Sequence, residues 1–179
     1  MMKENGISAR RILVTGGSGF IGTNVVERFV RSGCEVCSID VNPPHHAAHE
    51  GVFRNVDILD ADGLCGAMDE FRPQCVVHLA ARTTLEGRGL DDYRANTEGV
   101  ENLAAALSQT PTVRRCIFVS TKLICRNDYV PKSFDDYCPD TVYGQSKVLS
   151  ERIVKDNTSL RCQWCIVRPT GIWGPWFGE

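Results

Sequence analysis

Long hydrophobic runs are absent from this sequence, and none of its segments approaches the length that crosses a membrane. The opening residues, MMKENGISARR, contain no apolar core of the kind that a secretory signal peptide requires. Both absences argue against membrane insertion and export. We therefore expect a cytoplasmic protein with no membrane partner.

Clustered charge of one sign is missing as well. The 20 lysines and arginines nearly balance the 22 acidic residues, for a formal net charge of −2. Without a basic patch the chain has no electrostatic surface for a nucleic-acid partner. An apolar share of 42% in 179 residues predicts one folded domain over residues 1–179.

A disulfide framework is not expected, because the nine cysteines are odd in number and scattered along the chain. Two CxxC pairs, Cys34/Cys37 and Cys162/Cys165, suggest zinc at first sight. Both begin predicted strands that lie four spacings apart in the fold described below, or about 19 Å. Zinc–sulfur bonds of about 2.3 Å cannot bridge that gap. We expect free thiols in or near the core and no metal.

Three of the four histidines, His45, His46 and His49, crowd one segment. His45 and His49 have the i, i+4 spacing that chelates a metal on a helix. Two prolines precede them, and no acidic cluster supports a metal site. We predict a solvated loop.

Short apolar runs alternate with amphipathic patterns along the chain, which predicts parallel strands separated by helices. The expected strands are 10–15, 35–40, 52–57, 75–80, 116–121 and 162–169, and the expected helices are 20–32, 61–71, 91–108 and 141–157. The predicted fold class is α/β, a Rossmann-type doubly wound parallel sheet in the order 3-2-1-4-5-6 with helices on both faces.

Three spaced glycines, Gly16, Gly19 and Gly22, lie between the first strand and the first helix. In this context the first glycine permits a sharp turn, and the second lets the backbone approach a pyrophosphate. The third lets the helix pack closely, and the helix N-terminus supplies free N–H groups. The alternative is a plain strand–helix turn. We predict a dinucleotide site.

Asp40 ends the second strand, about 20 residues after the glycines. A carboxylate there accepts hydrogen bonds from both ribose hydroxyls and repels a 2′-phosphate. The pattern therefore favours NAD over NADP, and the alternative is a strand-end acid that caps a turn.

Six motifs occur in order: TGGSGFIG (15–22), Asp57–Ile58, HLAA (78–81), ANTEGVENL (95–103), FVST (118–121) and YGQSK (143–147). Together they resemble the extended short-chain dehydrogenase/reductases, in particular the NAD-dependent epimerase/dehydratase family that acts on nucleotide sugars. The resemblance runs from about residue 10 to the end. Members of this family continue into a C-terminal substrate domain, which we expect to be missing here. The exposed-looking aromatic residues of RPTGIWGPWFGE agree with that expectation.

The resemblance implies a catalytic set of Thr121, Tyr143 and Lys147. Tyr143 and Lys147 are four residues apart on a predicted helix and share a face. A tyrosine of pKa about 10 is about 4 kcal/mol from half ionisation at neutral pH. One cation at about 5 Å contributes about 3 kcal/mol, so Lys147 with an oxidised nicotinamide is expected to activate Tyr143. Thr121 would hydrogen-bond the reacting hydroxyl, with Ser120 as the neighbouring alternative.

The resemblance also implies further cofactor contacts. Phe20 and Ile21 match backbone donors to the pyrophosphate, and Asn96 matches an asparagine that anchors a helix. The remaining expected contacts are Asp57, Ile58, Leu79, Ala80, Ala81, Ser120, Tyr143, Lys147, Pro169 and Ile172.

The sequence indicates the family more specifically than it indicates the reaction. Lys122 and Leu123 follow Thr121 where sugar dehydratases carry an acidic pair, so dehydration is disfavoured. We expect a nucleotide-sugar epimerase, with a dehydrogenase or reductase of the same family as the alternative. A non-catalytic NAD-binding module is the alternative of another class. The family also implies a homodimer through helices 91–108 and 141–157.

Overall fold

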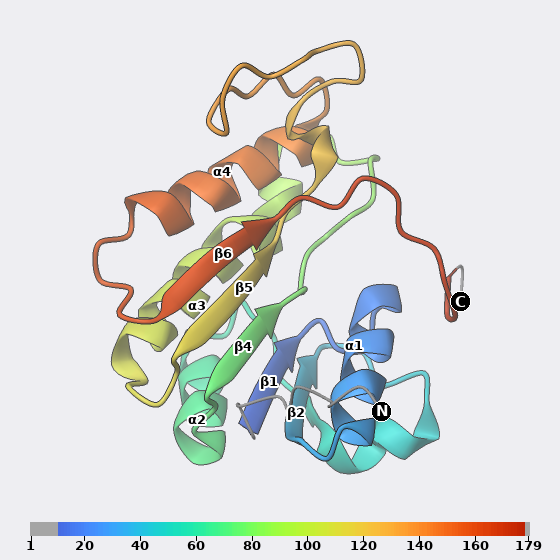
Figure 1. Ribbon diagram of the computed structural model, residues 1–179, viewed down its shortest axis with the longest axis vertical. Helices are drawn as coiled ribbons and strands as arrows, with labels where there is room; N and C mark the ends of the chain where they lie inside the picture. The colour runs from blue at the N-terminus through green and yellow to red at the C-terminus, as the bar shows by residue number, and fades with distance from the viewer. Residues whose placement is uncertain (1–10, 178–179) are drawn as a thin grey trace, which may run out of the picture.

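The computed structural model describes residues 11–177 as a six-stranded parallel sheet with the strand order β3-β2-β1-β4-β5-β6 (Figure 1). This order confirms the predicted fold class. In chain order the elements are β1 Arg11–Thr15, α1 Phe20–Arg31, β2 Glu35–Asp40, the 3-10 helix η1 Ala47–Val52, β3 Phe53–Asn55, α2 Ala61–Phe71, β4 Cys75–His78, the 3-10 helix η2 Leu90–Asn96, α3 Glu98–Gln109, β5 Arg115–Val119, the 3-10 helix η3 Lys122–Ile124, α4 Val142–Asp156 and β6 Gln163–Val167. Arg10, the first residue of the first expected strand, lies outside the described residues.

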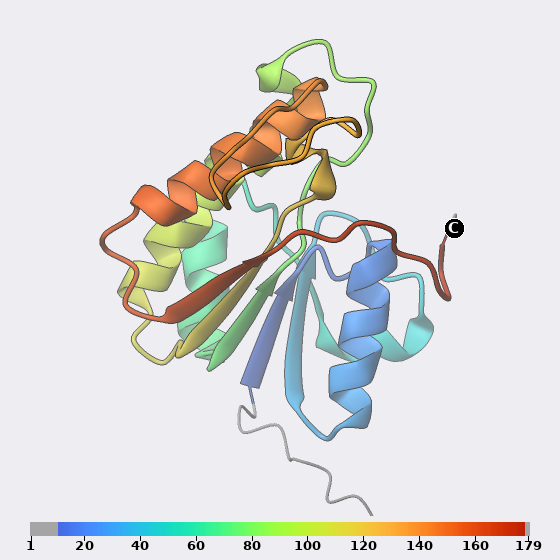
Figure 2. The ribbon, with the colours of Figure 1, turned by 45° about the horizontal axis from the view of Figure 1, so that its top comes forward.

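Helices α2, α3 and α4 lie on one face of the sheet and α1 on the other (Figure 2). Successive side chains of β1 point to opposite faces of the sheet, as they do in any pleated strand. Leu13 packs in the core under α2–α4, whereas Ile12 and Val14 pack with Val26 of α1. The core therefore consists of two layers that share the sheet.

The α1 side of the sheet is covered less completely than predicted. Helix α1 lies over β1 and β2, and the described residues place no helix over β5 and β6 on that face (Figure 1). Cys165 and Val167 of β6 are consequently exposed. The prediction that helices cover both faces of the sheet is therefore confirmed for β1 and β2 but not for β5 and β6.

The helix expected over residues 91–108 is two helices, η2 and α3, separated at Thr97. Tyr93 has non-helical backbone angles inside η2, and Thr97 has φ −116° and ψ −78°. Asn96, immediately before the break, is fully buried and bonded through its side chain. Tertiary contacts override the helical periodicity at this point.

Four of the expected strands, 52–57, 75–80, 116–121 and 162–169, are shorter than predicted. Helix η1 ends at Val52, so β3 begins at Phe53 and ends at Asn55. Strand β5 ends at Val119, and Ser120 and Thr121 lead into η3. Thr121 therefore lies beyond the strand, where its side chain is free to cap the next turn.

None of the nine cysteines, all of which lie within residues 11–177, forms a disulfide. Four of them are buried, and burial raises the pKa of the Cys37 thiol to about 11. Cys165 is exposed on β6, which corrects its predicted place near the core. Strands β1, β4 and β5 separate the two CxxC pairs. Within residues 11–177 no three His, Cys, Asp or Glu side chains are grouped to hold a metal ion, and no helix is long and apolar enough to span a membrane.

Candidate active site

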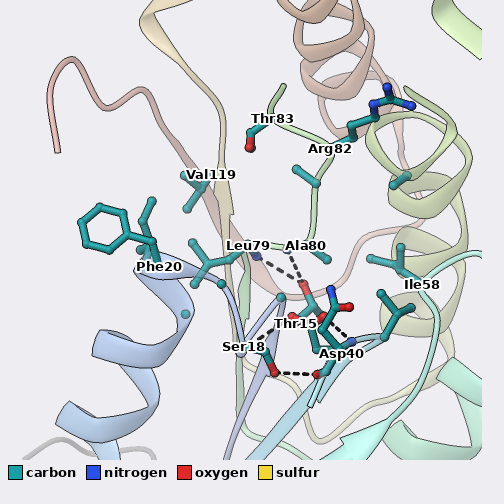
Figure 3. A pocket seen from close by; sticks show the side chains of 18 of the residues that line it. Thr15, Ser18, Phe20, Asp40, Ile58, Leu79, Ala80, Arg82, Thr83 and Val119 are labelled. Carbon is teal, nitrogen blue, oxygen red and sulfur yellow. Dashed lines mark hydrogen bonds between the residues drawn. The ribbon is translucent and has the colours of Figure 1, made fainter. Parts of the chain in front are cut away.

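A cleft of about 1020 Å³ opens at the carboxyl ends of the neighbouring strands β1 and β4, which are followed by helices on opposite faces of the sheet (Figure 2 and Figure 3). Open α/β sheets bind ligands at this switch point. Every predicted site residue except Asn96 lines the cleft. They are Gly16, Gly19, Phe20, Ile21, Gly22, Asp40, Asp57, Ile58, Leu79, Ala80, Ala81, Ser120, Thr121, Tyr143, Lys147, Pro169 and Ile172.

The three glycines differ in how closely other atoms surround them. Gly16 has φ +71°, and a Cβ there would stand 2.5 Å from the nitrogen of Ala80. A Cβ at Gly22 would overlap the Gly16 carbonyl oxygen, so the third glycine packs α1 against the turn itself. At Gly19 the nearest atom would be 3.5 Å away. Nothing inside the protein requires a glycine at this exposed position on the cleft, which suits the close approach of a diphosphate.

Helix α1 begins beside that turn with its first N–H groups available. Gly19 is the N-cap residue and provides no side-chain acceptor, and the first turn contains no acidic residue. The unpaired N–H groups and the helix dipole favour an anion at this end. The geometry fits a pyrophosphate.

Asp40 ends β2 at the rim of the cleft (Figure 3). Its carboxylate accepts the N–H of Ser18 at 3.1 Å and that of Asn42 at 3.0 Å. Ser18 Oγ in turn donates to the Asn42 carbonyl at 2.8 Å. These bonds fix the carboxylate and leave further lone pairs for ribose hydroxyls. The sequence pattern did not identify Ser18 as part of this arrangement.

Asn96 does not contact the cleft, and its predicted place among the cofactor contacts is wrong. Its side-chain amide accepts from the Arg82 N–H at 2.8 Å and donates to the Arg82 carbonyl and to Ser146 Oγ. These bonds tie the segment after β4 to α4. The anchoring function that the resemblance implied is confirmed.

The predicted catalytic residues converge at the α4 end of the cleft. Thr121 Oγ1 accepts the Leu123 N–H at 3.2 Å and lies within hydrogen-bonding reach of Tyr143. Lys147 is buried, and its ammonium donates to the Val119 carbonyl at 2.7 Å. Thr141 caps α4 through the Gly144 N–H and so fixes the helix turn that carries Tyr143.

Burial is the largest influence on the electrostatics of this group. Burial raises the pKa of Tyr143, and the hydrogen bond with Thr121 opposes that rise only in part. Burial also lowers the pKa of Lys147 to about 8, against the attraction of Glu151. The Lys147 ammonium is held by the Val119 carbonyl. The expected activation of Tyr143 by Lys147 together with an oxidised nicotinamide stays a prediction.

Two polar groups near the site were not indicated by any sequence motif. Thr15 Oγ1 lies 2.7 Å from His78 Nδ1, at matching positions of the adjacent strands β1 and β4. Glu151 accepts the Nε–H of Arg168 at 2.8 Å, and the Tyr137 hydroxyl also donates to Glu151 at 2.8 Å. Lys147 and Glu151 have the i, i+4 spacing that signals a shared helix face, which is the one available sequence clue.

The histidine segment is more ordered than predicted. His49 is buried in η1, and its ring stacks on His46 at 5.0 Å. Burial lowers the pKa of His49. His45 is exposed and lines the cleft. The prediction of a solvated loop is wrong for His49, because η1 folds back against β2.

A family model described as the NAD dependent epimerase/dehydratase family matches residues 12–179. The chain belongs to this family. The family is NAD-dependent, and the glycine turn and Asp40 carboxylate of this chain fit that cofactor.

Relatives within and around the family act on different substrates. A 3 beta-hydroxysteroid dehydrogenase/isomerase of Mycobacterium tuberculosis is 33% identical, covering 92% of this chain and 47% of its own length. A UDP-glucose 4-epimerase of Mycolicibacterium smegmatis is 31% identical, covering 92% and 57%.

Solved structures give the same result. The Bordetella bronchiseptica enzyme WbmG with NAD is 30% identical with a TM-score of 0.76, covering 93% of this chain and 55% of the other. UDP-glucose 4-epimerase of Thermus thermophilus with NAD is 30% identical with a TM-score of 0.75, covering 88% and 54%. The chain spans about half the length of these relatives.

Proposed function

We propose that the protein containing this chain is an NAD-dependent nucleotide-sugar epimerase that works by reversible oxidation of a sugar hydroxyl. One observation carries the proposal: a single cleft is lined by the dinucleotide-type glycine turn and by Thr121, Tyr143 and Lys147. The UDP-glucose 4-epimerases among the relatives support a nucleotide sugar as the substrate class. The lack of an acidic pair after Thr121 favours epimerisation over dehydration.

In this proposal each residue has one task. Tyr143 takes the proton of the substrate hydroxyl, and Thr121 hydrogen-bonds the same oxygen as its charge changes. Lys147 binds the ribose of the cofactor. When bound, NAD supplies the hydride acceptor and a positive charge beside the phenol. Because Tyr143 is buried and its pKa is raised, proton uptake depends on Thr121 and on positive charge in the cleft.

The Tyr143→Phe variant tests the chemistry separately from binding. Phenylalanine keeps the ring that contacts Tyr93 and removes only the hydroxyl. We expect NAD affinity within about twofold of the unmodified protein by calorimetry, and conversion of UDP-hexose epimers to fall at least about 1000-fold. Undiminished turnover would remove Tyr143 as the base. Tight NAD binding with no turnover of any substrate by the unmodified protein would support the non-catalytic module.

A hydroxysteroid oxidation is the second candidate, because steroid dehydrogenases are among the relatives at 33% identity. The same assay distinguishes the two. Oxidation of a 3β-hydroxysteroid with net formation of NADH, and no interconversion of UDP-hexoses, would show that the substrate is a steroid and not a nucleotide sugar. The site residues and their tasks stay the same in both cases.

A further inference from the structure

A small buried cavity lies directly behind the catalytic end of the cleft. Val119, Ser120 and Lys147 line both the cleft and this cavity, so they form the wall between them. His78, Ser150 and Glu151 supply the other polar groups of its lining. Its volume of about 10 Å³ is close to what one water molecule needs.

The hydrogen bonds of Thr15 determine which nitrogen of His78 carries the proton. Thr15 Oγ1 accepts the N–H groups of Leu79 and Ala80, each at 3.2 Å (Figure 3). The Leu79 N–H also donates to the Thr15 carbonyl at 3.0 Å and is shared between the two oxygens. The two N–H groups still face the two lone pairs of the hydroxyl, which favours donation of its hydrogen to the histidine over acceptance of a third N–H. The hydroxyl hydrogen therefore goes to His78 Nδ1, 2.7 Å away. Nδ1 is the acceptor, and the ring proton of neutral His78 resides on Nε2.

His78 also stays neutral over the physiological range. Its side chain is buried between the sheet and the helices, with a relative exposure of 3%. Burial, assisted by the nearby charge of Lys147, lowers the pKa of His78 to about 3. Nε2 is thus a fixed N–H donor.

That donor has no acceptor among residues 11–177. Ser120 Oγ likewise makes no hydrogen bond of normal geometry there, although it lies close enough to Glu151 to help lower the pKa of that carboxyl. Unpaired buried donors are costly and are rare in native proteins. Both groups border the same cavity.

We propose that this cavity binds one ordered water that accepts the His78 Nε2–H and connects it to Lys147. The water has two lone pairs for His78 and for one N–H of the Lys147 ammonium. Its two hydrogens have acceptors in Ser120 Oγ and the Glu151 carboxylate on the cavity wall. With one N–H on the Val119 carbonyl and one on the water, Lys147 directs its third N–H into the cleft. His78 is then a positioning residue for Lys147.

NMR of the unmodified chain tests the hydration site itself. With only four histidines, the imidazole nitrogens of His78 are assignable after selective ¹⁵N labelling. We expect the Nε2–H tautomer at neutral pH, and a cross-peak from that proton to a long-lived water. The Nδ1–H tautomer, or an Nε2–H without a water cross-peak, would overturn the proposal. This measurement does not depend on the proposed reaction.

Two matched variants test the effect on Lys147, which rests on the cofactor task given to it above. In His78→Asn the amide oxygen takes the place of Nδ1 opposite Thr15, and no group replaces Nε2. In His78→Gln the amide nitrogen replaces the Nε2 donor. We expect NAD affinity to fall about tenfold in the asparagine variant and to stay within about twofold in the glutamine variant. Equal affinities in the two variants would contradict the positioning of Lys147 through water.

Discussion

At the residue scale, the site combines positions that need the smallest side chain with buried groups that carry charge. Gly22 has no room for a Cβ, and Lys147 has its ammonium almost fully withdrawn from solvent. The first requirement is steric and the second electrostatic. A substitution at Gly22 therefore tests steric fit, and a substitution at Lys147 tests the cost of a buried charge.

Gly22→Ala should destabilise the chain by about 1–3 kcal/mol, because the added methyl overlaps the backbone of the Gly16–Gly17 turn. NAD affinity should fall with it, since the turn must shift. Chemical denaturation and calorimetry measure the two effects.

The control is Gly66→Ala on the exposed side of α2, where a Cβ meets nothing within 4 Å. That variant should gain about 0.5–1 kcal/mol from helix propensity. An equal response of the two glycines would contradict the packing argument.

Lys147→Met should stabilise the chain at neutral pH by roughly 2–3 kcal/mol while weakening NAD binding. The pKa of Lys147 is about 8 in the folded chain against 10.5 for an ordinary lysine. The unfolded chain therefore binds the proton more tightly, and burial of the ammonium costs about 3 kcal/mol below pH 8.

The cost shrinks as the pH rises from about 8 to about 10.5, so the stability gap between Lys147→Met and the unmodified chain should close over that range. Urea denaturation at a series of pH values measures the gap. A gap that does not change with pH would mean that the lysine is solvated in the folded state.

At the element scale, α4 joins the site to the rest of the sheet. Its buried face carries Tyr143, Lys147 and Glu151 at successive turns. Glu151 binds Arg168 at the end of β6, one residue before Pro169 on the cleft. The Arg168 guanidinium also donates to the Phe134 carbonyl and stacks 3.7 Å from the Phe134 ring. One ion pair thus holds a strand end and the long loop after η3 against the catalytic helix.

Glu151→Gln should cost about 3 kcal/mol of stability, because it leaves the partly buried Arg168 without a counter-charge. The exposed i, i+4 pair of Arg94 and Glu98 provides the control. Glu98→Gln should leave stability nearly unchanged, since solvent screens that pair. Denaturation midpoints compare the two variants, and similar losses would contradict a special contribution of the buried pair.

At the scale of the whole molecule, the helices that the family resemblance assigns to a dimer already pack on the sheet. Ala104, Ala106 and Leu107 of α3 are buried in the core, whereas Ala105 faces outward. On α4, Leu149 is half-buried. A homodimer through α3 and α4 remains a proposal, and it has to use these outward positions.

Ala105→Glu should convert such a dimer into monomers without lowering the melting temperature, because the side chain lies outside the core. Sedimentation equilibrium measures the mass. Ala47→Glu, an exposed position on η1, is the control and should not affect assembly. A monomeric unmodified chain would remove the proposal.

The sequence by itself determined the features that depend on local pattern. Strand and helix periodicities predicted the elements of the sheet, and the spacing of Gly16, Gly19 and Gly22 located the cleft. The four-residue step from Tyr143 to Lys147 placed both side chains on one helix face. These features depend on neighbours within a few turns of chain, so a single sequence records them directly.

Only the tertiary structure decided what depends on distant neighbours. Asn96 lies outside the cleft because its amide is bonded to both Arg82 and Ser146, and Thr121 became a cap because β5 ends early. The pKa values of Tyr143 and Lys147 follow from burial, and the proton of His78 follows from bonds made by Thr15 on another strand. Burial and hydrogen-bond competition are set by the folded arrangement, so no local motif contains them.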